Sequence, residues 1–259
     1  QSHIDEVMND DNIGVLLESR LESFEGQVGS FKAGIDCKEG PKTKKFGAVI
    51  VAMENESGID RVKELLDVRL ATPQLIEEDN KWSSAVISSR HGIYFAGDCL
   101  GKRDINQSLK DAETAVNEVQ RVLNGDEELI HGPKALIDTE KCILCLACVR
   151  SCPHRAIDID LNREAAVVTE LACWGCGICA AECPSKAIGI RGFTDEQILA
   201  ETAEPERIVA FCCVDSACRA ADLAGTERME YSRDVQIVQV PCAGRIDSLC
   251  ILKEFERGA

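Results

Sequence analysis

Cysteine is the residue type whose number and spacing point to chemistry in this chain. The sequence has 15 cysteines in 259 residues, and two runs of them have the form C-x2-C-x2-C-x3-C-P. Thiolates at this spacing bind iron–sulfur clusters. Zinc is the alternative metal, but cysteine-rich zinc sites usually take their ligands as two separate pairs. The spacing therefore favours iron and sulfide over zinc.

Each cluster is predicted to take three ligands from one run and the fourth from the other. Three cysteines in a loop wrap one cluster, whereas the fourth lies on a short helix that points the opposite way and reaches the other cluster. The predicted ligand sets are Cys142, Cys145, Cys148 and Cys183 for the first cluster and Cys173, Cys176, Cys179 and Cys152 for the second.

The two runs belong to an internal repeat over residues 133–192. A shift of 31 residues places every cysteine of the first run on one of the second, and it places Pro153 on Pro184. Each unit is predicted to form a strand, a cysteine loop, a short helix and a strand, and the two units should pack about a pseudo-twofold axis. Gly175 and Gly177 are expected to let the backbone close around the second cluster.

This repeat resembles the bacterial two-cluster ferredoxins, with all eight ligand positions matched. The resemblance implies two [4Fe–4S] clusters and one-electron relay. Trp174 lies inside the second loop. Two roles remain open for it: a cover that keeps water from the second cluster, or a simple hydrophobic plug.

The segment before the repeat is predicted to mix strands and helices. Residues 12–17, 26–35, 46–53 and 92–96 have strand-like composition. Apolar residues recur at helical spacing over residues 106–123. Asp104 is the expected N-cap of this helix and Gly125 its expected stop.

An apolar strand that ends in Gly97-Asp98, followed by Gly101 and a long helix, resembles the second fingerprint of flavoproteins with two dinucleotide-binding domains. The resemblance implies that Gly97, Asp98 and Gly101 contact FAD. No G-x-G-x-x-G follows a strand in this sequence, so the ADP half of such a site would come from other residues or another chain.

With the repeat included, residues 10–192 resemble the A subunit of heterodisulfide reductase. The likeness rests on Gly29-Ser-Phe-Lys, on Gly92–Asp98 with residues 102–108, and on the double cysteine run. That family implies a soluble FAD and iron–sulfur hub of anaerobic metabolism. The chain is then expected to be a C-terminal portion of such a protein.

The remaining segment is predicted to form a βαβ unit with parallel strands at residues 207–212 and 235–240. The expected helices are residues 216–224 and 247–255. Cys213 and Cys242 follow these strands, so they should lie at one sheet edge, and Cys218 should lie within reach. These thiols could hold a [2Fe–2S] cluster or zinc, or they could be small buried apolar residues.

Phe211-Cys-Cys and Val240-Pro-Cys-Ala-Gly-Arg-Ile-Asp247 resemble the delta subunit of methyl-viologen-reducing hydrogenase. The resemblance implies a [2Fe–2S] cluster and transfer of a partner's electrons to the heterodisulfide reductase hub. Ser216 stands where that family has a second cysteine. The fusion of both modules is also similar to the B subunit of the quinone-interacting oxidoreductase complex.

Charge and hydropathy exclude other classes of protein. The 29 basic and 45 acidic residues give a net charge of −16, which argues against binding to nucleic acid. No apolar run approaches the about 20 residues of a membrane span, and residues 1–11 do not read as a signal peptide. The sequence predicts a cytoplasmic protein without direct membrane insertion.

The expected fold class is α/β and α+β, in three domains. Residues 1–130 would be the C-terminal part of an FAD-binding domain, 131–193 the two-[4Fe–4S] domain, and 194–259 an incomplete hydrogenase-delta-like module. The predicted function is electron transfer between a flavin, two clusters and a partner subunit of a redox complex. A free-standing ferredoxin-type carrier without flavin is the alternative, and a structural iron–sulfur protein that binds a macromolecule is a third hypothesis.

Overall fold

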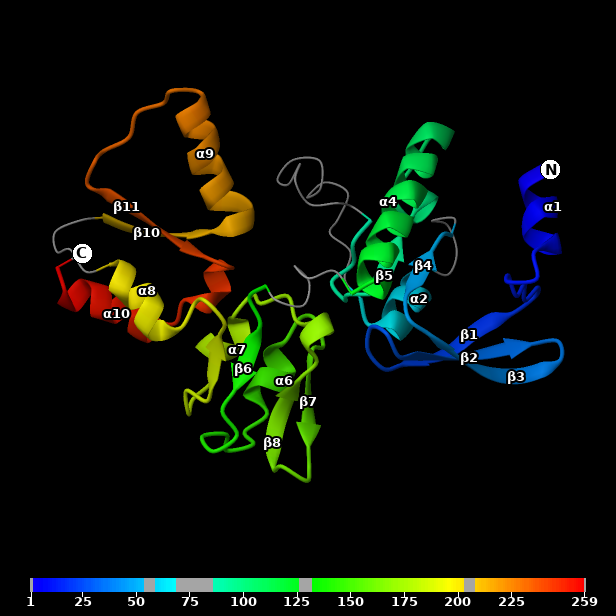
Figure 1. The fold of residues 1–259 in the computed structure, drawn as a ribbon, viewed down its shortest axis with the longest axis horizontal. Coiled ribbons are helices and arrows are strands. Elements are labelled where there is room, and N and C mark those ends of the chain that lie inside the picture. The colour runs from blue at the N-terminus through cyan, green and yellow to red at the C-terminus, as the bar shows by residue number, and fades with distance from the viewer. Residues whose placement is uncertain (1, 54–58, 69–85, 126–131, 203–207, 259) are drawn as a thin grey trace.

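The computed structural model describes residues 2–53, 59–68, 86–125, 132–202 and 208–258. Figure 1 shows three parts in chain order, which we call the N-terminal module (residues 2–125), the cysteine-repeat module (132–192) and the C-terminal module (193–258). Helices and strands are mixed throughout, and every sheet has two or three strands. The predicted boundary at residues 130 and 131 lies outside the described residues. None of the described helices has the length and apolar character needed to cross a membrane.

The N-terminal module is built on an antiparallel sheet and a parallel strand pair. The sheet has the order β1 (Arg20–Glu25), β2 (Phe31–Cys37), β3 (Gly40–Phe46). Strands β4 (Val49–Val51) and β5 (Ile93–Phe95) run parallel. Helix α1 (Ser2–Asn9) begins the chain, and α2 (Ile59–Leu66) follows β4.

One predicted strand is absent from this module, and two strands form that the sequence did not predict. The strand expected at residues 12–17 is not formed, and β1 and β3 form instead. Strand β3 holds a proline and three lysines and is mostly exposed, so it lacks the apolar alternation that marks a strand. Its pairing with β2 creates it, and its place at the sheet edge tolerates Pro41.

Helix α4 (Ile105–Leu123) confirms the predicted long helix and its N-cap. The Asp104 carboxylate accepts the Gln107 N–H at 2.8 Å, and the Gln107 side chain accepts the Asp104 N–H at 3.1 Å. This capping box satisfies two of the donors that a helix start leaves free. The helix ends at Leu123 with Asn124 as its C-cap, directly before the expected stop at Gly125, which has a φ of +68°.

The cysteine-repeat module confirms the predicted order of elements in both units. Each two-stranded sheet takes one strand from each unit, because the first strand of one unit pairs antiparallel with the last strand of the other. The units are therefore interlocked rather than side by side. Their elements are β6 (Ala135–Ile137), α6 (Ala147–Ser151) and β7 (Ile157–Asp160), then β8 (Ala165–Val168), α7 (Ile178–Ala181) and β9 (Ile188–Ile190).

The C-terminal module confirms the predicted parallel pair. Strands β10 (Ile208–Cys213) and β11 (Val235–Val240) run parallel in register. A π-helical turn at Val214–Cys218 separates β10 from α9 (Arg219–Thr226), so the helix begins later than the expected residue 216. Helices α8 (Asp195–Glu201) and α10 (Ser248–Glu256) complete the module.

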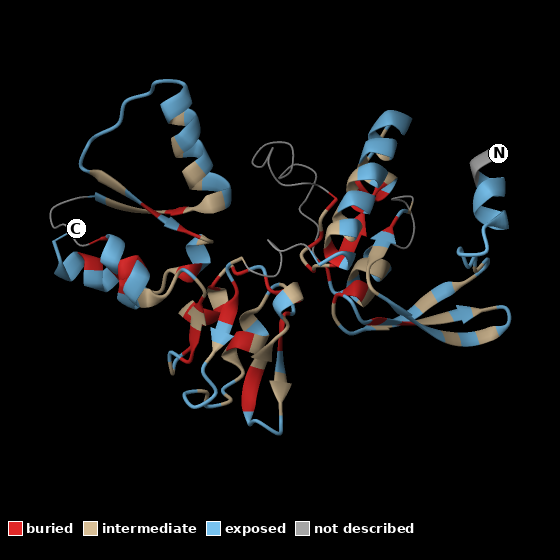
Figure 2. Cartoon of the chain, viewed as in Figure 1, coloured by how far each residue is buried: buried red, intermediate tan, exposed pale blue. Residues whose placement is uncertain are grey.

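One apolar core joins the first two modules, and a smaller one belongs to the third. A single cluster of buried residues in mutual contact includes Val28 of the N-terminal module and Ile190 of β9. Ile198, Val238 and Val240 form the smaller core. Figure 2 shows buried ribbon concentrated in the cysteine-repeat module and at the base of α4.

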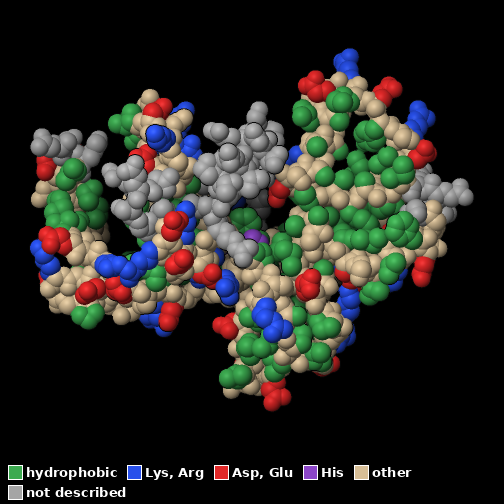
Figure 3. Space-filling view, turned by 180° about the vertical axis from the view of Figure 1, so that it is seen from behind, with side chains coloured by type: hydrophobic (Ala, Val, Ile, Leu, Met, Phe, Trp, Pro, Cys, Tyr) green, Lys and Arg blue, Asp and Glu red, His purple; other side chains and the backbone are tan. Residues whose placement is uncertain are grey.

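The C-terminal module leaves apolar side chains in solvent. Seen from behind in Figure 3, hydrophobic side chains cover much of this module. The exposed ones on or after α9 and β11 include Leu223, Met229, Tyr231 and Ile237. A two-stranded sheet offers too little surface for the three helices of this module to bury all their apolar side chains against it.

We expect Phe31→Ala to destabilise the chain strongly and Phe255→Ala to have little effect. Phe31 is fully buried at the start of β2, with its ring 5.0 Å from that of Phe24, whereas Phe255 is 67% exposed in α10. Truncation of a buried phenylalanine costs about 3–5 kcal/mol, and an exposed one about 0.5 kcal/mol. Urea unfolding of both variants measures this, and equal midpoints would contradict the assigned core.

Candidate metal centre

The two cysteine loops have the same backbone conformation. In the first loop Leu144 and Leu146 have φ values of +52° and +62°, and in the second Gly175 and Gly177, 31 residues later, have +66° and +86°. The left-handed region is strained for residues with a side chain. Its recurrence at matching positions means that the C-x2-C-x2-C spacing itself imposes this turn, whichever residue fills it.

The first pocket lies inside the first loop. All four thiols of the first predicted ligand set line it: Cys142, Cys145, Cys148 and Cys183. The first three come from the loop and the start of α6, and Cys183 comes from the other repeat unit, directly after α7. The remaining lining is mainly apolar, from residues such as Ile143, Ala166 and Ile188.

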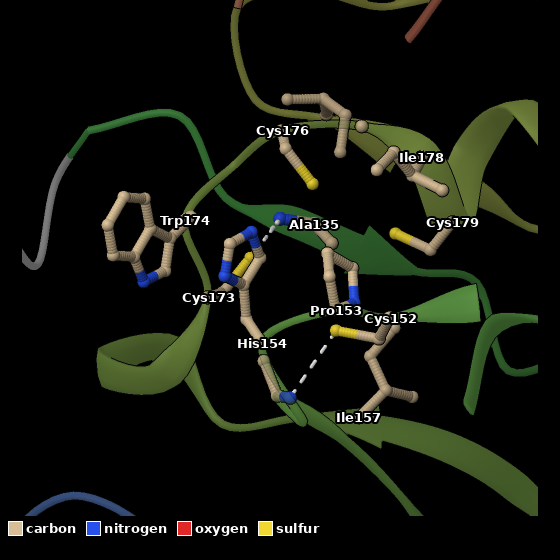
Figure 4. Close-up of a pocket in the computed structure, with 13 residues that line it drawn as sticks. Ala135, Cys152, Pro153, His154, Ile157, Cys173, Trp174, Cys176, Ile178 and Cys179 are labelled. Atoms are coloured by element: carbon tan, nitrogen blue, oxygen red, sulfur yellow. Dashed lines mark hydrogen bonds between the residues drawn. The ribbon is translucent and has the colours of Figure 1, made fainter. Parts of the chain in front are cut away.

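The second pocket is its repeat-related counterpart and is drawn in Figure 4. All four thiols of the second predicted set line it: Cys152, Cys173, Cys176 and Cys179. Figure 4 shows Cys152, Cys176 and Cys179 directed toward a common space, with Trp174 and His154 closing one side. Cys152 belongs to the first unit but lies at the second pocket, because β7, the strand that follows it, pairs with β8 of the second unit.

The donor sets suit iron–sulfur clusters. Each pocket offers four sulfurs and an apolar lining, which is the chemistry that [4Fe–4S] clusters require. No group of three or more His, Cys, Asp or Glu in the described part of the chain is placed to hold a single metal ion. Each set of four thiols lines a pocket of its own.

Backbone amides donate to the sulfurs in a pattern that the repeat preserves. Cys152 Sγ accepts from the Ala156 N–H at 3.4 Å, and Cys183 Sγ accepts from the Ala187 N–H at 3.3 Å, 31 residues later. Cys173 Sγ accepts from the Gly175 N–H at 3.4 Å and from the Ala135 N–H at 3.5 Å. Such bonds favour a negatively charged sulfur.

Burial acts in the opposite direction. It raises the pKa of Cys179 to about 12, and it is also the main cause that raises the pKa of Cys148 and Cys176. At Cys183 burial again has the largest effect, but donors from Ser185 and the following backbone outweigh it and lower the pKa. A buried thiol with a raised pKa loses its proton when a metal binds, so cluster binding must supply the energy of ionisation.

The glycines of the second loop make room for the protein rather than only for a cluster. A Cβ on Gly175 would lie 2.2 Å from the Pro133 carbonyl oxygen. A Cβ on Gly177 would lie 2.4 Å from Cδ of Arg245, a fully buried residue of the C-terminal module. The expected close approach of backbone to cluster is therefore joined by a close approach of two other chain segments.

Two histidines, His91 and His154, lie against Trp174. The His154 ring stacks on the Trp174 ring at 4.8 Å and 3°, and the His91 ring lies 4.6 Å away on a tilt of 45°. His154 Nδ1 also contacts the Ser89 carbonyl at 2.8 Å. His91 and Ser89 belong to the N-terminal module, so this aromatic group joins that module to the second pocket. Nothing in the spacing of these residues could have revealed it.

The predicted flavin contacts lie where β5 ends. Gly97 and Asp98 begin a short 3-10 turn (Gly97–Leu100), and Gly101 follows it. Gly97 and Gly101 have φ values of +72° and +114°, and the Asp98 side chain is exposed. The Cys99 thiol is buried and donates to the Ala96 carbonyl at 3.1 Å. The turn thus presents the Asp98 carboxylate outward and Cys99 inward.

The C-terminal thiols share one end of their sheet. Cys213 ends β10, and Cys242 follows β11 by two residues. The Ser216 hydroxyl lies 2.5 Å from the Cys213 sulfur and lowers the pKa of that thiol, and the Cys218 thiol donates to the Cys212 carbonyl at 3.3 Å. Cys242 lies close enough to Cys176 to help raise the pKa of that thiol, after burial. The turn after Cys242 packs against Ile178, which lines the second pocket.

Two family profiles match the chain. Residues 141–187 match the 4Fe-4S dicluster domain. Residues 208–259 match the family described as methyl-viologen-reducing hydrogenase, delta subunit. The two matches cover both cysteine loops and the βαβ unit.

Curated relatives extend the likeness to most of the chain. The A subunit of the ferredoxin:CoB-CoM heterodisulfide reductase of Methanosarcina mazei is 35% identical over 176 residues, 65% of this chain and 22% of the relative. A protein of Archaeoglobus profundus described as like the heterodisulfide reductase A subunit is 30% identical over 70% of this chain and 28% of its own length. The iron-sulfur D subunit of the F420-non-reducing hydrogenase vhu of Methanocaldococcus jannaschii is 50% identical over 52 residues, 20% of this chain and 39% of the relative.

The chain is therefore homologous over part of its length to the A subunit of heterodisulfide reductase, and it carries a 4Fe-4S domain and a hydrogenase-delta-like C-terminal domain. It spans 22% to 28% of the length of the two A-subunit relatives named above.

The aromatic group predicts a pH dependence of stability. Burial, followed by the charges of Lys134, His154 and Arg121, lowers the pKa of His91 to about 4. The folded state therefore favours the neutral ring, and the unfolded chain, with a pKa of about 6.5, binds the proton more readily. Stability should be complete above about pH 6.5 and fall by up to about 1.4 kcal/mol per pH unit as the pH drops toward 4.

His91→Phe keeps an aromatic ring but removes this titration. We expect urea unfolding of the variant to lose less stability between pH 6.5 and 5.5 than the parent chain does. An identical pH dependence in the two proteins would show that His91 titrates as it does in the unfolded chain.

Proposed function

We propose that this chain is the iron–sulfur electron-transfer part of a heterodisulfide-reductase-like redox complex. In this proposal the first pocket holds one [4Fe–4S] cluster through Cys142, Cys145, Cys148 and Cys183, and the second pocket holds another through Cys173, Cys176, Cys179 and Cys152. The observation that carries the proposal is the gathering of these eight thiols, four by four, around two repeat-related pockets.

The chain's own residues would bind and shield the clusters. A bound [4Fe–4S] cluster accepts and releases one electron. The apolar linings and the Trp174–His154 stack exclude water from the pockets, and the amides of Ala156 and Ala187 stabilise charge on the sulfurs.

We place a flavin contact at residues 97–101, within an FAD-binding domain that residues 1–130 would help to form. The parallel strands β4 and β5, the exposed Asp98 carboxylate and the capped start of α4 support this proposal. The aromatic group of His91, Trp174 and His154 lies between that module and the second pocket. Residues 131–193 would be the two-cluster domain.

We place the docking site of a partner redox protein on residues 194–259. The relatives of this part are hydrogenase iron-sulfur subunits. Its thiols Cys213, Cys218 and Cys242 are the candidate ligands of a [2Fe–2S] cluster. Cys242 lies near enough to Cys176 of the second pocket to affect its pKa. The exposed apolar side chains of this module supply a surface that a partner could cover.

Cysteine-to-serine variants test the ligand sets. We expect about eight irons per chain after anaerobic purification, since two cubanes hold four each. Cys183→Ser should alter the EPR signal that Cys145→Ser alters, and Cys152→Ser should alter the signal that Cys176→Ser alters. If Cys183→Ser instead changed the same signal as Cys176→Ser, the fourth ligand would not cross between units.

Asp98→Asn tests the flavin contact. Asp98 is the proposed flavin contact, so the variant should bind less FAD than the parent chain when each is mixed with FAD and any partner chain that completes the site. Flavin absorbance after gel filtration measures the difference, with Asp104→Asn as a control at the helix cap. A flavin content of zero in the parent protein, with iron intact, would favour a free-standing ferredoxin-type carrier.

A further inference from the structure

A buried lysine lies beside the second pocket. Lys134 is 4% exposed, and its ammonium donates to the backbone carbonyl of Cys173 at 2.6 Å. The next residue, Ala135, donates its N–H to the Cys173 sulfur. Lys134 therefore contacts the backbone of one proposed ligand. It directly precedes β6, whose first residue, Ala135, lines the pocket.

The charges around Lys134 do not cancel it. Glu170 and Arg191 are the other ionised side chains that act on it, and these two pair with each other at 3.6 Å. Burial lowers the pKa of Lys134, whereas its contacts with Cys173 and Glu170 favour the charged ammonium and Arg191 opposes it. The hydrogen bond of the ammonium goes to the backbone of a proposed ligand, Cys173.

The first pocket has no such charge at the matching position. The 31-residue shift carries Lys134 onto Ala165, which is fully buried. The basic group that contacts the first loop is Arg150, whose guanidinium donates to the Cys145 carbonyl at 3.2 Å from an exposed position. Water and salt screen an exposed charge far more than a buried one.

We propose that Lys134 is a positioning residue that raises the reduction potential of the second cluster relative to the value its ligand set alone would give. This proposal rests on the two-cluster function proposed above. An electron added to a cluster adds a negative charge, and a nearby buried cation stabilises that charge in the low dielectric of the interior. Hydrogen bonds, net charge and exposure are the features by which a protein sets such potentials.

The asymmetry would separate two clusters that otherwise have matching ligands. The second pocket lies between the aromatic group of His91, Trp174 and His154 and the sheet end that carries Cys242. A higher reduction potential of the second cluster would place an added electron mainly in the pocket that contacts both neighbouring modules.

Lys134→Met in the anaerobically purified full chain tests the proposal, with EPR-monitored potentiometric titration as the measurement. We expect one of the two cluster steps to become harder to reduce by about tenfold, which is ~59 mV more negative for one electron, while the other stays. Lys134→Arg should keep most of the parent reduction potential because it keeps the charge. Arg150→Met is the matched control and should move neither step, because that cation is exposed.

The step that moves is assigned in a Cys145→Ser background. That substitution alters the first pocket, so Lys134→Met should shift the step that Cys145→Ser leaves unchanged. Lys134→Gln keeps a donor for the Cys173 carbonyl and serves if the Met variant loses iron. Loss of iron in both variants would show a structural role and overturn the proposal, and so would two unmoved steps at full iron content.

These results are distinct from a failure of the proposed function. A parent chain with far fewer than about eight irons would reject the two-cluster assignment itself. A parent chain with full iron, whose steps do not respond to Lys134, would reject the role of the lysine alone.

Discussion

The structure depends on the exchange of strands between the two repeat units. Strand β6 pairs with β9, and β7 pairs with β8, so neither unit has a sheet of its own. This exchange brings Cys152 to the second loop and Cys183 to the first. A thiol set in which each unit completes the other couples folding to metal binding, because ligands from distant positions must be held together before either set is complete.

The repeat is symmetric in its backbone and asymmetric in its surroundings. Positive φ values recur at Leu144 and Gly175, and sulfur-directed amides recur at Ala156 and Ala187. The second loop is approached closely by Pro133 at Gly175 and by Arg245 at Gly177. Arg245 donates to the Asp195 carboxylate at 2.5 Å and to the Phe193 carbonyl at 3.0 Å, both in its own module, and these bonds hold the side chain that packs against Gly177 of that loop. The second pocket is therefore the one in contact with both other modules.

The joint between the first two modules is both polar and apolar. Arg155 pairs with Asp67 at 2.6 Å, and the Gln27 amide donates to the Arg155 carbonyl at 2.5 Å. The shared core and the rings around Trp174 lie beside these contacts. An exposed ion pair contributes little by itself, so the apolar core and the stacked rings carry most of the stability of this joint. Trp174 stacks on His154 at the wall of the second pocket and is 41% exposed, so both roles first considered for it stay open.

The sequence by itself determined the local features: the two cysteine runs and their repeat, the capped helix α4, and the parallel strands β10 and β11. These depend on spacing, periodicity and caps that lie within a few residues of each other. Tertiary structure alone decided the strands β1 and β3, the grouping of His91 with Trp174, and the burial of Lys134 beside Cys173. Each of these arises from contacts between residues far apart in the chain, and neither composition nor periodicity records which distant surface a side chain will meet.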